Sequence, residues 1–351
     1  MVDTGSQLWL ALDFSRWKQG FIGQFLGAEA DVVFVARDAL ASRHAEQANV
    51  LAWSSKVDDE LVALCTERGW TLWRIEDGFV RSAGLGTDLV APLSLALDRR
   101  GIYYDATAVS DLELMLEHRH FSAPLLRRAR AVREQLVELK LSKYNVGNEG
   151  DALELPADYP IILVPGQVET DASIAKGSPE IRTNHALLSA VRSARPDAFI
   201  LYKPHPDVLA GGRIGELSDN GSELYDLLVT ETAITDLFAR VDEVHTMSSL
   251  SGFEALLRGC KVVTWGMPFY AGWGLTDDIL SCERRTRMLT LDELVAAALI
   301  CYPRYVDPDS GQLCEVERVM EILHQQRHQG RNPTFSQRLY RGYRALIKGK
   351  R

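Results

Sequence analysis

The chain has 351 residues, which is more than one ordinary hydrophobic core accommodates, so two domains are expected. Hydrophobic residues make up 46% of the chain and charged residues 25%, ordinary globular values that exclude a disordered or collagen-like protein. The net charge of -9 argues against general nucleic-acid binding, which needs a basic surface, but it leaves room for a local basic pocket.

The first half of the chain alternates short apolar segments with helical patterns. Buried strands are predicted at 8–13, 31–36, 49–53 and 71–76. Helices are predicted at 14–27, 57–69 and 124–144, and a hairpin is predicted from 92–98 and 101–105. Residues 145–160 combine Asn, Gly, Asp and Pro without periodicity, so we place a hinge there.

The second half repeats this alternation. Strands are predicted at 161–166, 198–205, 243–247 and 260–266. Helices are predicted at 183–195, 234–240, 249–259 and 290–302. Such alternation is typical of parallel sheets covered by helices, so we expect an α/β fold of two Rossmann-like domains, 1–150 and 151–325, facing a central cleft.

Residues 326–351 form a third region, a basic amphipathic tail. Phe335, Leu339 and Tyr343 recur at nearly helical spacing among Arg and Lys residues. Two interpretations stay open. The tail forms a helix on an anionic membrane surface, or it packs back on the N-terminal domain with its basic face in solvent.

Several classes of protein lose support from missing motifs. The five cysteines form no C-x-x-C pair, which disfavours a disulfide framework or zinc site and favours a reducing cytoplasm. A P-loop is absent, and no G-x-G-x-x-G follows the first strand, so ATPase and nicotinamide-binding functions are disfavoured. Asp307 and Asp309 have the D-x-D spacing of metal-dependent sugar transferases, but they precede Ser-Gly and are predicted to form a turn. The sequence has no apolar stretch of the ~20 residues that a membrane span needs, and no signal peptide is predicted.

Polar segments directly after strands are the candidates for function, because ligands of open α/β sheets bind beyond the carboxyl ends of the strands. Glu76 and Asp77 end the fourth predicted strand, and Arg81 follows. A carboxylate there can take a proton from an attacking hydroxyl, and Arg81 can bind a carboxylate. An ordinary turn with Asp as a helix cap is the alternative.

The strand at 161–166 is followed by a second polar segment. Gln167, Glu169 and Asp171 alternate, so an extended backbone would project all three to one side, whereas a solvated loop is the alternative. The strand at 198–205 ends in Lys203 and His205, and His205 is bracketed by two prolines that stiffen the backbone. Together they form a small cationic site suited to a phosphate leaving group.

A third segment joins the strand 243–247 to a helix. Ser248 and Ser249 lie at the start of this helix, where hydroxyls and backbone N–H groups favour an anion, and Gly252 and Glu254 lie in its first turn. A Ser that only caps the helix is the alternative. The loop after the next strand contains Trp265 and Tyr270 among glycines and is predicted to form a wall of the ligand site.

Taken together and in this order, these segments resemble the KpsC/LipB-type capsule polysaccharide proteins, which are bacterial retaining β-Kdo transferases (Kdo is 3-deoxy-D-manno-oct-2-ulosonic acid). The resemblance covers nearly the whole chain and rests on EDGFVRSAGLG, PLSLALD, GIYYDA, VPGQVETDASI, YKPHPDV, HTMSSLSGFEALLRG, WGMPFYAGWGL and YPRYVDP. Larger members carry two such modules, and this chain resembles one module of the C-terminal type.

The resemblance implies a GT-B-like glycosyltransferase that takes Kdo from CMP-β-Kdo. It implies that His205, Ser248 and Ser249 hold the CMP phosphate, that Glu254 binds the ribose and that Asp171 is the nucleophile. We expect double displacement, in which Lys203 assists departure of CMP and Glu76 or Asp77 deprotonates the acceptor.

Arg81 is the candidate for the Kdo carboxylate, and Gln167, Gly252, Trp265 and Tyr270 complete the expected binding residues. No cofactor or metal is expected. The expected acceptor is a Kdo-containing glycan or glycolipid, used in the cytoplasm or at the inner face of the inner membrane.

Three other functions stay open. The first is a transferase for another CMP-activated sugar, such as sialic or legionaminic acid, on the same scaffold. The second is a non-catalytic protein of capsule assembly or export. A metal-dependent sugar transferase is a third alternative, which activity in EDTA would exclude.

Overall fold

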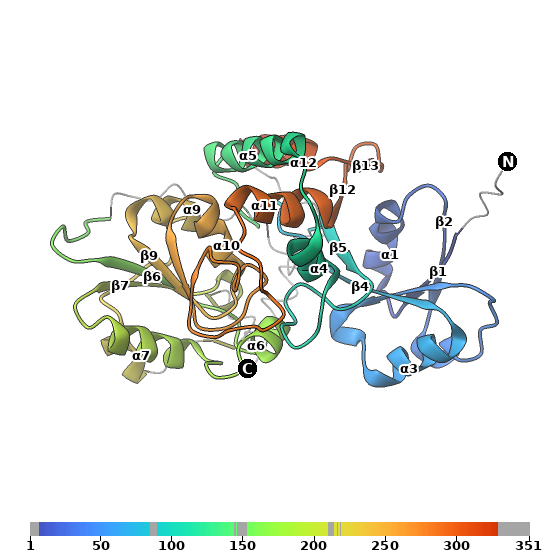
Figure 1. The fold of residues 1–351 in the computed structure, drawn as a ribbon, viewed down its shortest axis with the longest axis horizontal. Coiled ribbons are helices and arrows are strands. Elements are labelled where there is room, and N and C mark those ends of the chain that lie inside the picture. Colours follow the sequence, from blue (N-terminus) through green and yellow to red (C-terminus); the bar gives the residue numbers. More distant parts are fainter. Residues whose placement is uncertain are drawn as a thin grey trace, which may run out of the picture.

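The computed structural model describes residues 7–84, 90–143, 145, 153–209, 214–215, 217 and 219–328. The chain forms two lobes, each built on one β-sheet (Figure 1). Three helices lie over the region between the lobes: α5 (Ala123–Glu138), α11 (Leu291–Val295) and α12 (Val316–His328). The predicted basic tail lies outside the described residues from position 329 onward.

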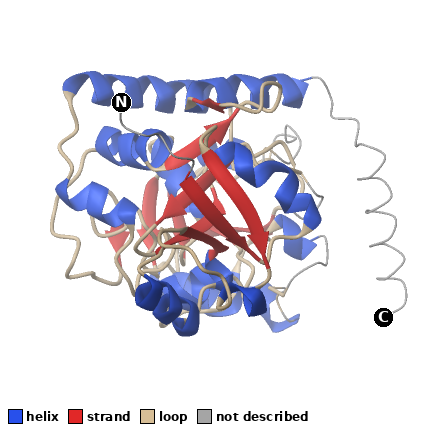
Figure 2. Ribbon diagram, turned by 90° about the vertical axis from the view of Figure 1, so that its right-hand side faces the viewer, coloured by secondary structure: helices blue, strands red, loops and turns tan. Residues whose placement is uncertain are grey.

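The first lobe contains a seven-stranded sheet of order β13-β12-β5-β4-β3-β1-β2. Its strands are β1 (Gln7–Leu12), β2 (Ala30–Val35), β3 (Asn49–Trp53), β4 (Thr71–Asp77), β5 (Ser94–Asp98), β12 (Pro303–Val306) and β13 (Leu313–Cys314). Strands β1 to β4 are parallel, whereas β5, β12 and β13 add antiparallel pairs. Helices lie on both sides of this sheet (Figure 2). They include α1 (Arg16–Ile22), α2 (Arg37–Leu40), α3 (Asp59–Arg68) and α4 (Asp111–His118).

The strands of this sheet are apolar on both faces, as the sequence predicted. In β1, Trp9 and Ala11 belong to one buried cluster, while Leu10 and Leu12 belong to another. Successive side chains of a strand point to opposite faces, so an uninterrupted apolar segment buries both faces at once.

The second lobe contains a six-stranded, fully parallel sheet of order β11-β10-β9-β6-β7-β8. Its strands are β6 (Ile161–Pro165), β7 (Phe199–Lys203), β8 (Leu227–Leu228), β9 (Glu243–Thr246), β10 (Lys261–Thr264) and β11 (Asp277–Asp278). Its helices are α6 (Ala172–Gly177), α7 (Asn184–Ala194), α8 (Pro206–Leu209), α9 (Ile234–Leu237) and α10 (Leu250–Leu257). This order is that of a dinucleotide-binding Rossmann sheet, and the strand order reverses between β6 and β9.

Two predictions about the first half are wrong. Residues 101–105 form turns rather than the second strand of a hairpin, because the Asp98 carboxylate accepts the N–H groups of Arg100 and Gly101 and bends the chain. The predicted helix over 124–144 is shorter, since α5 ends at Glu138.

The chain also returns to the first sheet near its end. Strand β12 pairs antiparallel with β5, and β13 pairs with β12, so residues 303–314 lie in the first lobe rather than in the expected second domain at 151–325. Without β12, the N–H and C=O groups along one edge of β5 would be unpaired, and pairing with β12 gives them hydrogen-bond partners. The turn between β12 and β13 contains Asp307 and Asp309, as predicted, and Asp307 accepts the N–H of Asp309.

The lobes share an apolar core directly below the end of β4. Phe79 from the first lobe stacks on Phe269 from the second at 4.7 Å between ring centroids, and Phe253 packs 6.0 Å from Phe79. All three side chains are at least 95% buried. Aromatic rings in such contact stabilise the join between the lobes through burial and ring packing.

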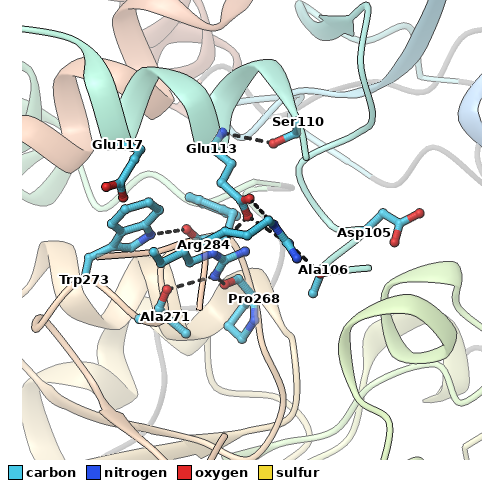
Figure 3. A network of polar contacts seen from close by, with 12 residues as sticks. Asp105, Ala106, Ser110, Glu113, Glu117, Pro268, Ala271, Trp273 and Arg284 are labelled. Carbon is cyan, nitrogen blue, oxygen red and sulfur yellow. Dashed lines mark hydrogen bonds and ion pairs between the residues drawn. The ribbon is translucent and has the colours of Figure 1, made fainter. Parts of the chain in front are cut away.

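A buried ionic cluster adds a polar join beside this core (Figure 3). Glu113 on α4 accepts from Arg284 Nε at 2.7 Å and from Arg285 Nε at 3.0 Å. Arg285 also donates to the carbonyl groups of Pro268 and Ala271, which lie in the aromatic loop of the second lobe. One carboxylate of the first lobe therefore holds two loops of the second.

No helix in the described part of the chain is both long enough and apolar enough to cross a bilayer.

Removing the Glu113 carboxylate is expected to destabilise the whole protein. Glu113→Ala leaves the buried Arg285 guanidinium without its carboxylate partner, which should lower the free energy of unfolding by about 3 kcal/mol or more in urea denaturation. Glu117→Ala is the matched control, because Glu117 lies on the same helix and accepts hydrogen bonds from Thr286 at the surface. Its free energy of unfolding should fall by about 1 kcal/mol or less. Equal losses in the two variants would contradict this role for Glu113.

Candidate active site

A cleft of about 650 Å³ lies between the two lobes and receives residues from both. The first lobe contributes the end of β4, and the second contributes the loops that follow β6, β7 and β9. Nine of the predicted site residues line this cleft, namely Glu76, Asp77, Gln167, Asp171, Lys203, His205, Ser248, Ser249 and Glu254. The structure thus brings together segments that are far apart in the sequence, while their chemical roles stay predictions.

The loop after β6 is anchored at the point where the strand order reverses. Gln167 Oε1 accepts from the backbone N–H of Ser248 at 3.0 Å and from Thr246 Oγ1 at 3.4 Å, and its Nε2 donates to Ser248 Oγ. Asn184 holds the backbone of Gln167 from the other side, because its side chain accepts from Gln167 N and donates to Gln167 O, both at 2.8 Å. Gln167 therefore positions the loop after β9 in addition to lining the cleft.

The predicted common direction of Gln167, Glu169 and Asp171 is wrong. The backbone turns here, since the N–H of Asp171 bonds to the carbonyl of Val168. Glu169 points to the start of α7, where its carboxylate accepts the N–H of Asn184. The turn satisfies backbone groups that an isolated extended segment would leave unpaired.

Asp171 is the N-cap of α6 and lines the cleft. Its Oδ1 accepts the backbone N–H of Ser173 at 2.9 Å. This bond fixes the side chain at the start of the helix. A fixed carboxylate at the surface of the cleft suits a covalent nucleophile.

Glu76 and Asp77 have different surroundings although they are neighbours. Burial and the adjacent charge of Asp77 raise the pKa of Glu76 to about 7, and the charge of Asp171 contributes in the same direction. Asp77 instead pairs with Arg81 at 2.7 Å. Glu76 is therefore the member of the pair suited to accept and release a proton near neutral pH.

Arg81 does not line the cleft. Its side chain is only 4% exposed, pairs with Asp77 and donates to Ser82 Oγ. The predicted binding of a substrate carboxylate by Arg81 thus finds no support in its position, because the ion pair with Asp77 already engages the guanidinium inside the lobe.

The cations of the cleft come mainly from the second lobe. Lys203 Nζ donates to the carbonyl of Thr230 at 3.2 Å, and burial lowers the pKa of Lys203. Nδ1 of His205 accepts the backbone N–H of Asp207 at 3.1 Å, so a neutral His205 carries its proton on Nε2. That proton can be donated to a phosphate oxygen.

The start of α10 differs from the predicted anion site. The backbone N–H groups of Ser248, Ser249 and Ser251 already bond to Gln167, to Thr246 and to the Ser249 hydroxyl. Since the protein itself satisfies these donors, an anion would depend on side chains more than on the helix end.

Gly252, Tyr270 and Trp265 support the cleft from behind and are not part of its lining. The Tyr270 hydroxyl donates to the carbonyl of Ser249, and a Cβ at position 252 would collide with that hydroxyl, so only glycine fits. Trp265 Nε1 donates to His245 Nδ1 at 3.3 Å. Their predicted contact with substrate is replaced by a structural role in holding Ser249 and the neighbouring strands.

Glu254 lines the cleft and also ties it to the segment between the lobes. Its Oε1 accepts the backbone N–H of Lys143 at 2.7 Å, and burial raises the pKa of Glu254. The expected contact with a ribose stays a prediction.

Sequence reasoning missed several residues that line the cleft, among them Lys143, Tyr103 and Tyr104. Lys143 lies within the predicted helix 124–144, but α5 ends earlier, at Glu138. The tyrosines were assigned to a hairpin strand. Their signal was present, since Tyr-Tyr followed by Asp, next to a strand end, is unusual in a plain turn.

Comparison with known proteins agrees with this architecture. The family model for capsule polysaccharide biosynthesis proteins matches residues 49–305. The chain belongs to this family. LipA, the capsule polysaccharide modification protein of Neisseria meningitidis serogroup A, is 44% identical over 306 residues, which are 87% of this chain and 43% of LipA. LpsZ, a lipopolysaccharide-processing protein of Rhizobium meliloti, is 44% identical over 257 residues, which are 72% of this chain and 58% of LpsZ. The chain thus spans about half the length of these relatives.

Two solved structures of KpsC from Thermosulfurimonas dismutans have the same fold. One is a β-Kdo 2,7 transferase, 37% identical with a TM-score of 0.73, covering 91% of this chain and 99% of that one. The other is a β-Kdo 2,4 transferase, 32% identical with a TM-score of 0.78, and the match covers 91% of this chain and 98% of that one. The predicted GT-B-like architecture of this family member is therefore confirmed.

The raised pKa of Glu76 predicts how stability depends on pH. The pKa is about 7 when folded against an ordinary value of 4.5, so ionising Glu76 opposes folding, and its contribution to stability is lost as pH rises from 4.5 through 7. Glu76→Gln cannot ionise. Relative to wild type its free energy of unfolding should be similar at pH 5 and on the order of 2 kcal/mol higher at pH 8.

Urea denaturation of both proteins at the two pH values measures this difference. Asp77→Asn is the control, because it breaks the pair with Arg81 and should destabilise at both values. If the difference in unfolding free energy between Glu76→Gln and wild type is the same at pH 5 and pH 8, the raised pKa of Glu76 is contradicted.

Proposed function

We propose that the protein is a retaining β-Kdo glycosyltransferase that moves Kdo from CMP-β-Kdo to a Kdo-containing glycan or glycolipid. The observation that carries this proposal is the placement of one carboxylate from each lobe, Glu76 and Asp171, in a single cleft that also holds Lys203 and His205. Membership in the family and the fold shared with the two KpsC transferases support it. The second lobe would hold the CMP sugar and the first would take the acceptor.

The first step forms a covalent intermediate. An Asp171 carboxylate oxygen attacks C2 of Kdo, the bond from C2 to the phosphate oxygen breaks, and CMP departs with the electron pair of that bond. His205 donates a hydrogen bond from Nε2 and Lys203 supplies positive charge, so both stabilise the charge that develops on the phosphate. C3 of Kdo carries no hydroxyl and C2 is quaternary, so the transition state is oxocarbenium-like and gains from the nearby carboxylate.

The second step restores the configuration. The acceptor hydroxyl attacks C2 from the side that CMP vacated, its proton passes to the Glu76 carboxylate, and the bond to Asp171 breaks. Two inversions give net retention of the β configuration. Glu76 suits this step because its pKa of about 7 lets it take the proton and release it to water.

The cation for the Kdo carboxylate is Lys143 in this proposal, in place of Arg81. Lys143 lines the cleft, and its charge acts on Glu76 and Glu254. Arg81 instead pairs with Asp77 and holds it in place. The proposal therefore separates a structural ion pair, Asp77–Arg81, from the groups that contact substrate.

Intact-mass measurement tests the covalent step. Glu76→Gln should accumulate protein heavier by one Kdo residue when incubated with CMP-Kdo, because the intermediate forms but the acceptor is not deprotonated. Asp171→Asn is the control and should show no adduct. If neither wild type nor Glu76→Gln ever carries the adduct while β-linked product still forms, double displacement is excluded.

Calorimetry with CMP tests the phosphate role of His205. His205→Ala removes a hydrogen bond to a charged group and should weaken CMP binding about tenfold or more. His185→Ala, an exposed histidine on α7 outside the cleft, should leave the affinity unchanged. An unaltered affinity in His205→Ala would remove His205 from the phosphate site.

A further inference from the structure

The strand order of the first lobe reverses at β1. Strand β1 lies between β2 and β3, so the chain passes from β1 to one neighbour and then crosses to the other. In α/β sheets such a point opens a crevice beyond the carboxyl ends of the two diverging strands. Lys18 on α1 follows β1, and Trp53 is the last residue of β3.

Lys18 is held at this end of the sheet by an aromatic ring rather than by a carboxylate. Its Nζ lies 3.6 Å from the centroid of the Trp53 ring, and Trp53 is 9% exposed. Lys18 is half-buried and makes no hydrogen bond or ion pair with the residues that the structure describes. A ring face holds an ammonium in place without neutralising it, so the charge stays available to an anion.

Trp53 pairs in register with Ile75, so Lys18 and Trp53 lie beside the end of β4 that carries Glu76 and Asp77. Ser55, two residues beyond Trp53, lines the cleft together with Glu76 and Asp77, and both carboxylates act electrostatically on Lys18. Asp77 is already paired with Arg81. Glu76 is the proton acceptor in the proposed second step and is neutral when it holds that proton. Lys18 is thus a cation near the acceptor end of the cleft whose charge no described residue pairs.

We propose that Lys18 binds the carboxylate of an anionic acceptor sugar and so selects an acidic acceptor over a neutral one. This inference rests on the proposed function, because it assigns the acceptor side of the same cleft. The Lys18 side chain is long and would leave the Trp53 ring to meet the carboxylate in the cleft, which Ser55 lines. A partly buried charge-assisted hydrogen bond of this kind is stronger than a neutral one.

The test compares two acceptors that differ only in charge, a Kdo glycoside and the same glycoside with its carboxylate converted to a primary amide. Wild type should prefer the charged acceptor by about tenfold or more in kcat/KM. Lys18→Met should lose most of this preference by raising KM for the charged acceptor alone, and Lys18→Arg should restore part of it. Lys56→Met changes an exposed lysine of the same lobe and should keep the preference.

CMP affinity by calorimetry reports on the fold and the donor site in every variant and should not change. Loss of discrimination in Lys18→Met but not in Lys56→Met supports the inference. The inference is overturned if Lys18→Met still prefers the charged acceptor, or if wild type shows no such preference. Either result leaves the proposed function standing. Transfer to neither acceptor by wild type would instead contradict the proposed function itself.

Discussion

Glu76 and Asp171 come from different lobes, so chemistry that uses both depends on holding the two lobes at a fixed distance. Three features do this: the aromatic contact of Phe79 with Phe269, the Glu113 ionic cluster, and the return of β12 to the first sheet. All of them lie close to the segments that line the cleft. The lobes are therefore joined where their relative placement matters most, since an error of even 1 Å between reacting groups is costly.

The carboxylates at the cleft have different environments. Asp77 is paired with Arg81, Asp171 caps a helix, and Glu76 lies beside another acid in surroundings that raise its pKa to about 7. Three carboxylates that are alike in sequence thus differ in their surroundings: one is in an ion pair, one is at a helix cap, and one is able to take up a proton near neutral pH. The same division explains why Arg81 is inside the lobe and Lys143 faces the cleft.

Much of the site could be predicted because its residues follow strands. Parallel strands bring their carboxyl ends to one edge of a sheet, which groups Gln167, His205 and Ser248, and the expected cleft between two facing domains adds Glu76 from the other sheet. The errors arose where partners are distant in sequence. Tyr270 and Gly252 pack against each other, and no local sequence pattern predicts this contact. Lys143 reaches the cleft because α5 ends at Glu138, which no local sequence pattern predicts either.

Hydrophobic periodicity and the residues at strand ends were thus enough to specify two α/β lobes and the types of chemical group between them, since both are local properties of the chain. The pairing of β12 with β5, the neutralisation of Arg81 by Asp77 and the position of Lys18 on Trp53 followed only from the folded arrangement. Each of these depends on which side chains meet across long sequence separations. Burial and proximity then set the charge that each group carries.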